Sequence, residues 1–67
     1  MSKNIKERIA ILSELDDVIS TLNNGIAMFE GWANEDTTSE ETAKIYLENA
    51  MVKAKVRDMI IKVADSV

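Results

Sequence analysis

The sequence contains no cysteine, no histidine and no proline, and only two glycines among its 67 residues. The absence of cysteine and histidine excludes disulfide bonds, thiol nucleophiles, imidazole general bases and zinc sites built on sulfur or nitrogen ligands. A chain of this length forms at most one domain, here residues 1–67, and its core is small. Small domains without disulfides or metals often depend on oligomerisation for stability. We therefore expect this chain to associate with itself.

Clustered basic residues and long apolar runs are also absent. The net charge of −4 argues against binding to double-stranded nucleic acid, because phosphate contacts require clustered lysines and arginines. The apolar run at residues 59–61 is far shorter than the ~20 residues that span a bilayer, and the N-terminus lacks the features of a secretory signal. These features predict a cytoplasmic protein, in a bacterium or in the host of a phage, without a membrane segment.

Apolar residues recur at steps of three and four from Ile5 to Phe29, which is the pattern of a packed helix. The residues Asn-Asn-Gly at 23–25 favour turns. The apolar stripe nevertheless continues through them, and a glycine on the polar side of a helix costs only ~1 kcal/mol. The pattern predicts one helix over about residues 3–30, with a kink or an early stop at 23–25 as the alternative.

The ends of both helices carry capping residues. Gly31 is expected to close the first helix, with Trp32 folding back onto the last turn as in a Schellman motif. A second helix is expected over residues 39–65, where Glu40 and Glu41 suit the positive end of the helix dipole. Candidate N-caps, which accept a backbone N–H bond or form a capping box, are Ser2 or Asn4 for the first helix and Thr37, Thr38 or Ser39 for the second.

The second helix has an apolar surface that is wider than one partner helix covers, about a 100° stripe. Its main stripe consists of Ile45, Val52, Val56, Met59, Ile60, Val63 and Val67, interrupted by Asn49. A turn of ~100° per residue places a second stripe beside it. The sequence therefore predicts an all-α antiparallel hairpin that assembles into a homo-oligomeric bundle, as a four-helix homodimer or a larger assembly. The predicted oligomer interface, on the second stripe, is Ala43, Leu47, Ala50, Ala54, Ile61 and Ala64.

Polar residues among these apolar positions are candidate ligand contacts. Asn49 either fixes the register as a buried polar residue or donates hydrogen bonds to a ligand held between helices. Lys53 and Arg57 lie one turn apart, between the two stripes. Their stems rest on apolar surface or their charges pair with Glu14 or Asp17 of another helix. The alternative is an anion site at a subunit interface.

The chain has three aromatic residues, Trp32, Phe29 and Tyr46. Trp32 either closes the end of the hairpin or, with Phe29, anchors a protein partner, as tryptophans do in binding hot spots. Tyr46 belongs to the alanine-rich second stripe. There its ring suits either interface packing or stacking on a nucleotide base.

The charged residues carry no motif of an active site. The acidic residues between 35 and 41 lack the spacing of an EF-hand loop, and phosphate-loop, Rossmann and nucleophile-elbow motifs are absent. We expect a protein that is not an enzyme and uses no cofactor or metal. Arg8 interrupts the apolar stripe of the first helix and is expected to pair with Asp58 or Asp65.

Residues 47–54, with the sequence Leu-Glu-Asn-Ala-Met-Val-Lys-Ala, resemble a helix of the phage proteins that sequester cyclic nucleotides and so blunt the CBASS defence. The resemblance implies a small helical hairpin that forms oligomers and binds an anionic nucleotide at subunit interfaces. It makes Lys53 the matching basic position. The chain lacks an aromatic residue at positions 52 and 53, where that family would lead us to look for one.

Pattern and composition together favour an oligomeric interaction module that is not an enzyme and that binds and modulates, as an inhibitor, a protein partner. Small acidic proteins without cysteine are often inhibitors or regulators encoded by bacteria or their phages, which is an analogy rather than a physical argument. Two alternatives stay open. One is an anti-defence sponge for a cyclic nucleotide, and the other is a purely structural subunit of a helical bundle.

Overall fold

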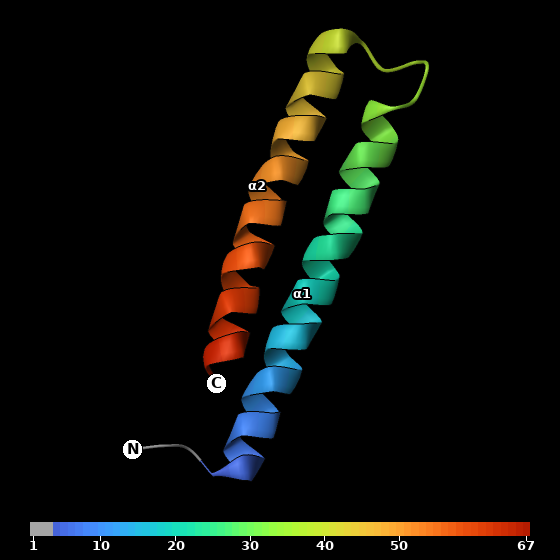
Figure 1. Cartoon of the computed structure of the whole chain (residues 1–67). Helices are drawn as coiled ribbons and strands as arrows, with labels where there is room; N and C mark the ends of the chain where they lie inside the picture. Colours follow the sequence, from blue (N-terminus) through green and yellow to red (C-terminus); the bar gives the residue numbers. More distant parts are fainter. Residues whose placement is uncertain (1–3) are drawn as a thin grey trace.

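The computed structural model describes residues 4–67, which form two helices packed side by side as an antiparallel hairpin (Figure 1). Helix α1 spans Ile5–Ala33 and helix α2 spans Glu40–Ser66. The predicted all-α hairpin is confirmed, although α1 ends at Ala33 rather than near residue 30. The predicted start at residue 3 lies outside the described residues. Neither helix in the described part of the chain has the length and apolarity needed to cross a bilayer.

Helix α1 continues without a break through Asn23, Asn24 and Gly25, as the apolar periodicity predicts. Gly25 adopts no positive φ, so its backbone is ordinary helix. A Cβ atom at this position would lie 3.2 Å from Cδ of Lys53. The missing side chain at Gly25 therefore makes room for the stem of Lys53 on α2.

Each helix begins with a polar side chain that binds a free backbone N–H group. The Asn4 Oδ1 atom accepts a hydrogen bond from the Glu7 backbone N–H at 2.9 Å. The Ser39 Oγ atom accepts one from the Thr42 backbone N–H at 3.2 Å. Asn4 and Ser39 are thus the N-caps of α1 and α2. The other candidate for α1, Ser2, lies outside the described residues.

The prediction that Gly31 caps α1 in a Schellman motif is wrong. Gly31 lies inside the helix without a positive φ, and the C-cap is Asn34, which itself has a right-handed helical conformation. Trp32 belongs to the last turn instead of folding back onto it. The Thr38 hydroxyl donates a hydrogen bond to the Trp32 carbonyl oxygen at 2.8 Å. The same carbonyl oxygen accepts a hydrogen bond from the Glu35 backbone N–H at 3.3 Å. Groups of the connector thus satisfy a carbonyl of the last turn, and no left-handed residue is required.

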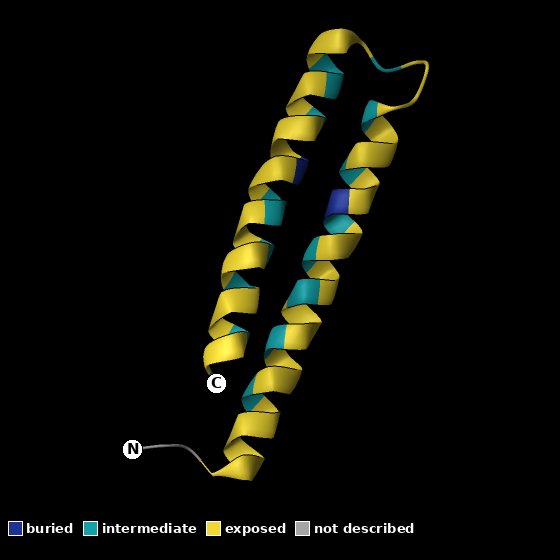
Figure 2. Ribbon diagram, in the orientation of Figure 1, coloured by how far each residue is buried: buried dark blue, intermediate teal, exposed yellow. Residues whose placement is uncertain are grey.

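The contact between the helices joins large side chains of α1 to mostly small ones of α2, with Tyr46 and Ile60 as the large exceptions on α2. Figure 2 shows the buried and half-buried residues on the sides where the two helices face each other. Within residues 4–67 only Ile26 and Ala50 are buried, with 9% and 5% of their surface exposed. The half-buried apolar residues are Ile11, Leu15, Ile19, Leu22, Phe29 and Ala33 on α1, Ala43, Tyr46, Ala54, Ile60 and Ala64 on α2, and Val67 directly after α2.

The second stripe of α2, which we expected to form the oligomer interface, is therefore the one that faces α1 in greater part. Four residues assigned to the oligomer interface, Ala43, Ala50, Ala54 and Ala64, are covered within the hairpin, whereas Leu47 and Ile61 are exposed. Alanine allows the close approach of the larger side chains of α1, which explains why this stripe faces α1. The greater part of the main stripe remains uncovered, with exposed fractions between 41% and 66% at Ile45, Val52, Val56, Met59 and Val63.

Candidate functional site

Arg57 connects the middle of α2 to α1. Its Nη1 atom donates a hydrogen bond to Asn23 Oδ1 at 2.9 Å. Its Nε and Nη2 atoms both donate to Asp58 Oδ1 at 3.2 Å. This contact with Asp58 is the only ion pair within residues 4–67, and neither Glu14 nor Asp17 takes part in one there. The Arg57 guanidinium is thus already paired with the carboxylate of Asp58.

Lys53 lies one turn before Arg57 and crosses Gly25 toward the aromatic residues of α1. Its Nζ atom is 5.6 Å from the centroid of the Phe29 ring, which is within the range of a cation–π contact. Its Cδ and Cε atoms lie 3.2 and 3.4 Å from the position of a Cβ atom on Gly25. The stem of Lys53 therefore rests on the surface of α1, as one of the two sequence interpretations predicts.

The three aromatic residues form a cluster at the connector end of the hairpin. The ring centroids of Phe29 and Trp32 are 5.5 Å apart in an edge-to-face arrangement, and those of Trp32 and Tyr46 are also 5.5 Å apart. Phe29 and Tyr46 are 5.9 Å apart. Aromatic pairs at these separations stabilise beyond simple area burial. Trp32 closes the end of the hairpin and retains 39% of its surface exposed, so its indole is also accessible to a partner.

The structure thus brings together most of the residues that the sequence singled out. Lys53, Tyr46, Phe29 and Trp32 belong to one connected group, and Arg57 lies on the adjacent turn of α2. Asn49 is not part of this group. It is exposed, and its Nδ2 atom donates a hydrogen bond to the Ile45 carbonyl oxygen of its own helix at 2.9 Å. Within one hairpin, Asn49 is therefore not a buried polar residue.

Arg8 also differs from the prediction. Its Nε atom donates a hydrogen bond to the Val67 backbone carbonyl oxygen at 2.9 Å, and it forms no ion pair with Asp58 or Asp65 in the described part of the chain. The antiparallel arrangement does bring Arg8 to the end of α2, as we expected. A backbone carbonyl near the negative end of the helix dipole is a suitable acceptor for a cation.

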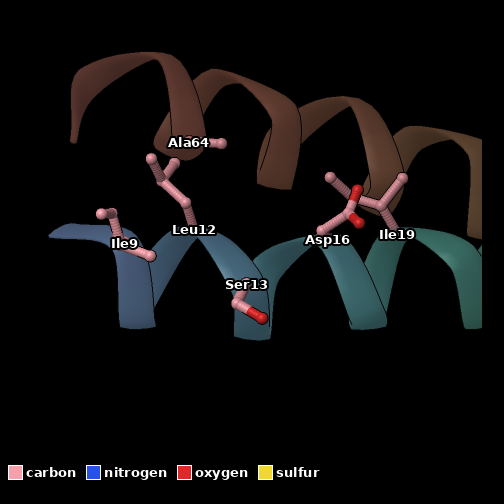
Figure 3. Close-up of a pocket in the computed structure, with 6 residues that line it drawn as sticks. All are labelled: Ile9, Leu12, Ser13, Asp16, Ile19 and Ala64. Atoms are coloured by element: carbon pink, nitrogen blue, oxygen red, sulfur yellow. The ribbon is translucent and has the colours of Figure 1, made fainter. Parts of the chain in front are cut away.

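A shallow apolar groove of about 500 Å³ follows the N-terminal half of α1 (Figure 3). Leu12 and Ile19 extend from α1 toward α2, and Asp16 is the only charged residue of the lining. Sequence reasoning did not single out Ile9, whose spacing from Ile5 and Leu12 was the available signal. The complete lining consists of Ile9, Leu12, Ser13, Asp16, Ile19 and Ala64.

The groups that the hairpin assembles suit noncovalent contacts. An ammonium, a guanidinium and three aromatic rings lie near the connector and the middle of the hairpin, while apolar surface covers much of the rest. Within residues 4–67 no group of three carboxylates is placed to hold a metal ion. Comparison with known protein families, with curated proteins and with solved structures finds no match to this chain.

Proposed function

We propose that this chain is a self-associating helical interaction module, without enzymatic activity, that binds and modulates a protein partner. The observation that supports the proposal is the apolar surface that one hairpin leaves uncovered. Within residues 4–67, fourteen large apolar side chains are more than a third exposed, whereas only Ile26 and Ala50 are buried. Single apolar residues on a surface are ordinary, but five of the fourteen follow one face of α2, and an apolar face of this kind supports an interaction site. These five are Ile45, Val52, Val56, Met59 and Val63.

The total surface area of the hairpin supports the same conclusion. The chain exposes 5335 Å², whereas a compact folded monomer of 7.5 kDa is expected to expose roughly 4,200 Å². The excess of roughly 1,000 Å² is comparable to the ~800 Å² that each partner buries in a standard protein interface. One hairpin therefore carries about enough additional surface to form one stable interface.

Stability provides a second reason. Isolated helices are marginal in water, and most helical stability in proteins comes from the packing of an apolar face. Two buried residues provide little core, and even complete cores of this size rarely supply more than ~3–5 kcal/mol. A second helical surface packed on the exposed apolar residues would complete the core that one hairpin lacks.

Thermal unfolding at two protein concentrations, followed by circular dichroism, tests the self-association. Because association stabilises the folded state by mass action, the Tm is expected to rise when the concentration is raised about a hundredfold. A Tm that does not change with concentration would contradict the proposal. A monomeric helical hairpin of the same length serves as the control for instrumental effects.

Trp32 is the best candidate anchor for a protein partner, because its ring is accessible beside Phe29 and Tyr46. A sponge for a cyclic nucleotide receives less support from a single hairpin. The Arg57 guanidinium already contacts a carboxylate, and the Lys53 ammonium lies against the Phe29 ring. Both side chains would have to leave these contacts to bind an anion.

A further inference from the structure

The exposed surface of α2 has the period of a coiled coil. Its residues, which we call the α2 stripe, are separated by alternating steps of four and three residues. All of them are exposed in the hairpin. Apolar residues at this spacing form the seam along which two helices pack knobs into holes. The α2 stripe consists of Ile45, Asn49, Val52, Val56, Met59 and Val63.

Four charged residues follow one edge of the α2 stripe at intervals of seven. We call Glu41, Glu48, Lys55 and Lys62 the rim; all four are exposed. In the described part of the chain none of them takes part in an ion pair. Helical geometry places every rim residue on the same side of the seam, because a step of seven is two turns. The rim is acidic in the first half of α2 and basic in the second half.

We infer that the α2 stripe is the docking site for a second copy of this chain, with the two α2 helices antiparallel. This inference rests on the self-association proposed above and assigns its surface. An antiparallel pair with a two-fold axis brings the same surface of each copy together. The acidic half of each rim then lies beside the basic half of the other. A parallel pair would place the two rims on opposite sides of the seam, so the rim charges of one copy would not meet those of the other.

The rim charges also fix the register of the pair. Glu48 and Lys55 lie symmetrically about a point between residues 51 and 52, and so do Glu41 and Lys62. One two-fold axis near this point therefore brings both kinds of pair together, and each pair occurs twice. Rim charges of this kind determine partner choice and orientation in coiled coils.

The core of this pair follows from the same register. The layers of the seam are symmetric about a point one residue earlier, between residues 50 and 51, because edge residues of an antiparallel seam contact partners slightly offset from the core layers. Ile45 then lies opposite Val56 of the second copy, and Asn49 lies opposite Val52. Asn49 retains a hydrogen bond from its Nδ2 atom to the Ile45 carbonyl oxygen, which reduces the cost of covering its amide. A polar residue in such a seam favours one register over others.

Exchange of the rim charges tests the docking. One variant, Glu41→Lys/Glu48→Lys, has an entirely basic rim, and a second, Lys55→Glu/Lys62→Glu, has an entirely acidic one. Each variant alone is expected to dimerise at least about tenfold more weakly, because four attractive pairs become repulsive. An equimolar mixture is expected to form a heterodimer, which native mass spectrometry distinguishes by its mass.

Glu35→Lys/Asp36→Lys is the matched control. It changes the net charge as much as the first variant does, but its residues lie in the connector, away from the rim. Its dimerisation is expected to remain within about twofold of the wild type. Circular dichroism of every variant checks that the helices persist, since all the substituted side chains are exposed. Association of both rim variants with wild-type affinity would overturn the inference.

Disulfide linkage tests the orientation, and the absence of native cysteine makes the result unambiguous. A mixture of Ile45→Cys and Val56→Cys is expected to form a mixed disulfide under mild oxidation. Ile45→Cys alone linking to itself would show a parallel pair and overturn the inference. If the wild type associates but neither test gives the expected result, self-association stands and this surface is refuted. If the wild type is monomeric, both proposals fail.

Discussion

Replacing Gly25 by alanine sets two opposing effects against each other. Gly25 lies in the interior of α1, where alanine favours the helix by about 1 kcal/mol over glycine. The new Cβ atom would lie 3.2 Å from Cδ of Lys53, closer than ordinary van der Waals contact, so the lysine stem must shift. This shift weakens the contact of its ammonium with the Phe29 ring, which is worth about 0.5–1 kcal/mol at an exposed site.

The two effects nearly cancel, so the free energy of unfolding of Gly25→Ala is expected to stay within about 0.5 kcal/mol of the wild type. Gly31→Ala is the matched control. Gly31 is also inside α1, but a Cβ atom there meets nothing within 4 Å, and its substitution is expected to stabilise by about 0.5–1 kcal/mol. In a Lys53→Ala background, Gly25→Ala should recover the full helical benefit, which a double-mutant cycle measures.

Urea denaturation followed by circular dichroism measures these differences. All variants must be compared at one protein concentration, because self-association makes stability depend on concentration. Equal stabilisation by Gly25→Ala and Gly31→Ala in the presence of Lys53 would show that the lysine stem does not rest on Gly25. A loss of more than about 1 kcal/mol would mean that less flexible atoms occupy this space.

Three further substitutions test individual contacts in the same assay. Ser39→Ala is expected to lower the free energy of unfolding by about 1 kcal/mol, and Ser39→Gly by only a few tenths of a kcal/mol. Equal losses of stability in the two variants would contradict an N-cap role for the hydroxyl. Arg57→Ala is expected to lower the free energy of unfolding by about 1 kcal/mol, because it removes the hydrogen bond to Asn23. Asp58→Ala is expected to lower it by less than about 0.5 kcal/mol, because its ion pair is exposed. A larger loss for Asp58→Ala than for Arg57→Ala would refute the bridge between the helices. Trp32→Ala is expected to lower the free energy of unfolding by about 1–3 kcal/mol, less than the 3–5 kcal/mol lost when a fully buried aromatic residue is replaced. An unchanged stability would show that the indole does not close the hairpin.

The helices themselves could be predicted from the sequence because their apolar periodicity is strong. In α1 the stripe continues through Leu22, Ile26 and Phe29, and packing of this face outweighs the helical penalty of Gly25. Gly31 misled the prediction because a glycine near a helix end does not require a positive φ. The Thr38 hydroxyl and the Glu35 backbone N–H both donate to the Trp32 carbonyl oxygen, and these contacts depend on the path of the connector, which local spacing does not determine.

The orientation of α2 about its own axis could not be predicted, because both of its stripes are apolar. Complementary size decides between them. Ala50 allows the large side chains of α1 to approach closely, whereas Val52 and Met59 on the other stripe would hold the helices apart. The position of Lys53 between the two stripes was predictable from the helical wheel. Its contact with Phe29 was not, since this contact depends on the register between the helices.

The assembly mass of the wild-type protein shows most directly whether one hairpin associates with another. Sedimentation equilibrium at micromolar concentration gives this mass, and a native mass spectrum shows any bound small molecule. We predict a homodimer, twice the chain mass of 7.5 kDa, or a larger assembly of such dimers, without additional mass. Extra mass of nucleotide size would favour the cyclic-nucleotide sponge over the protein-binding module, and a stable monomer would contradict self-association of the hairpin.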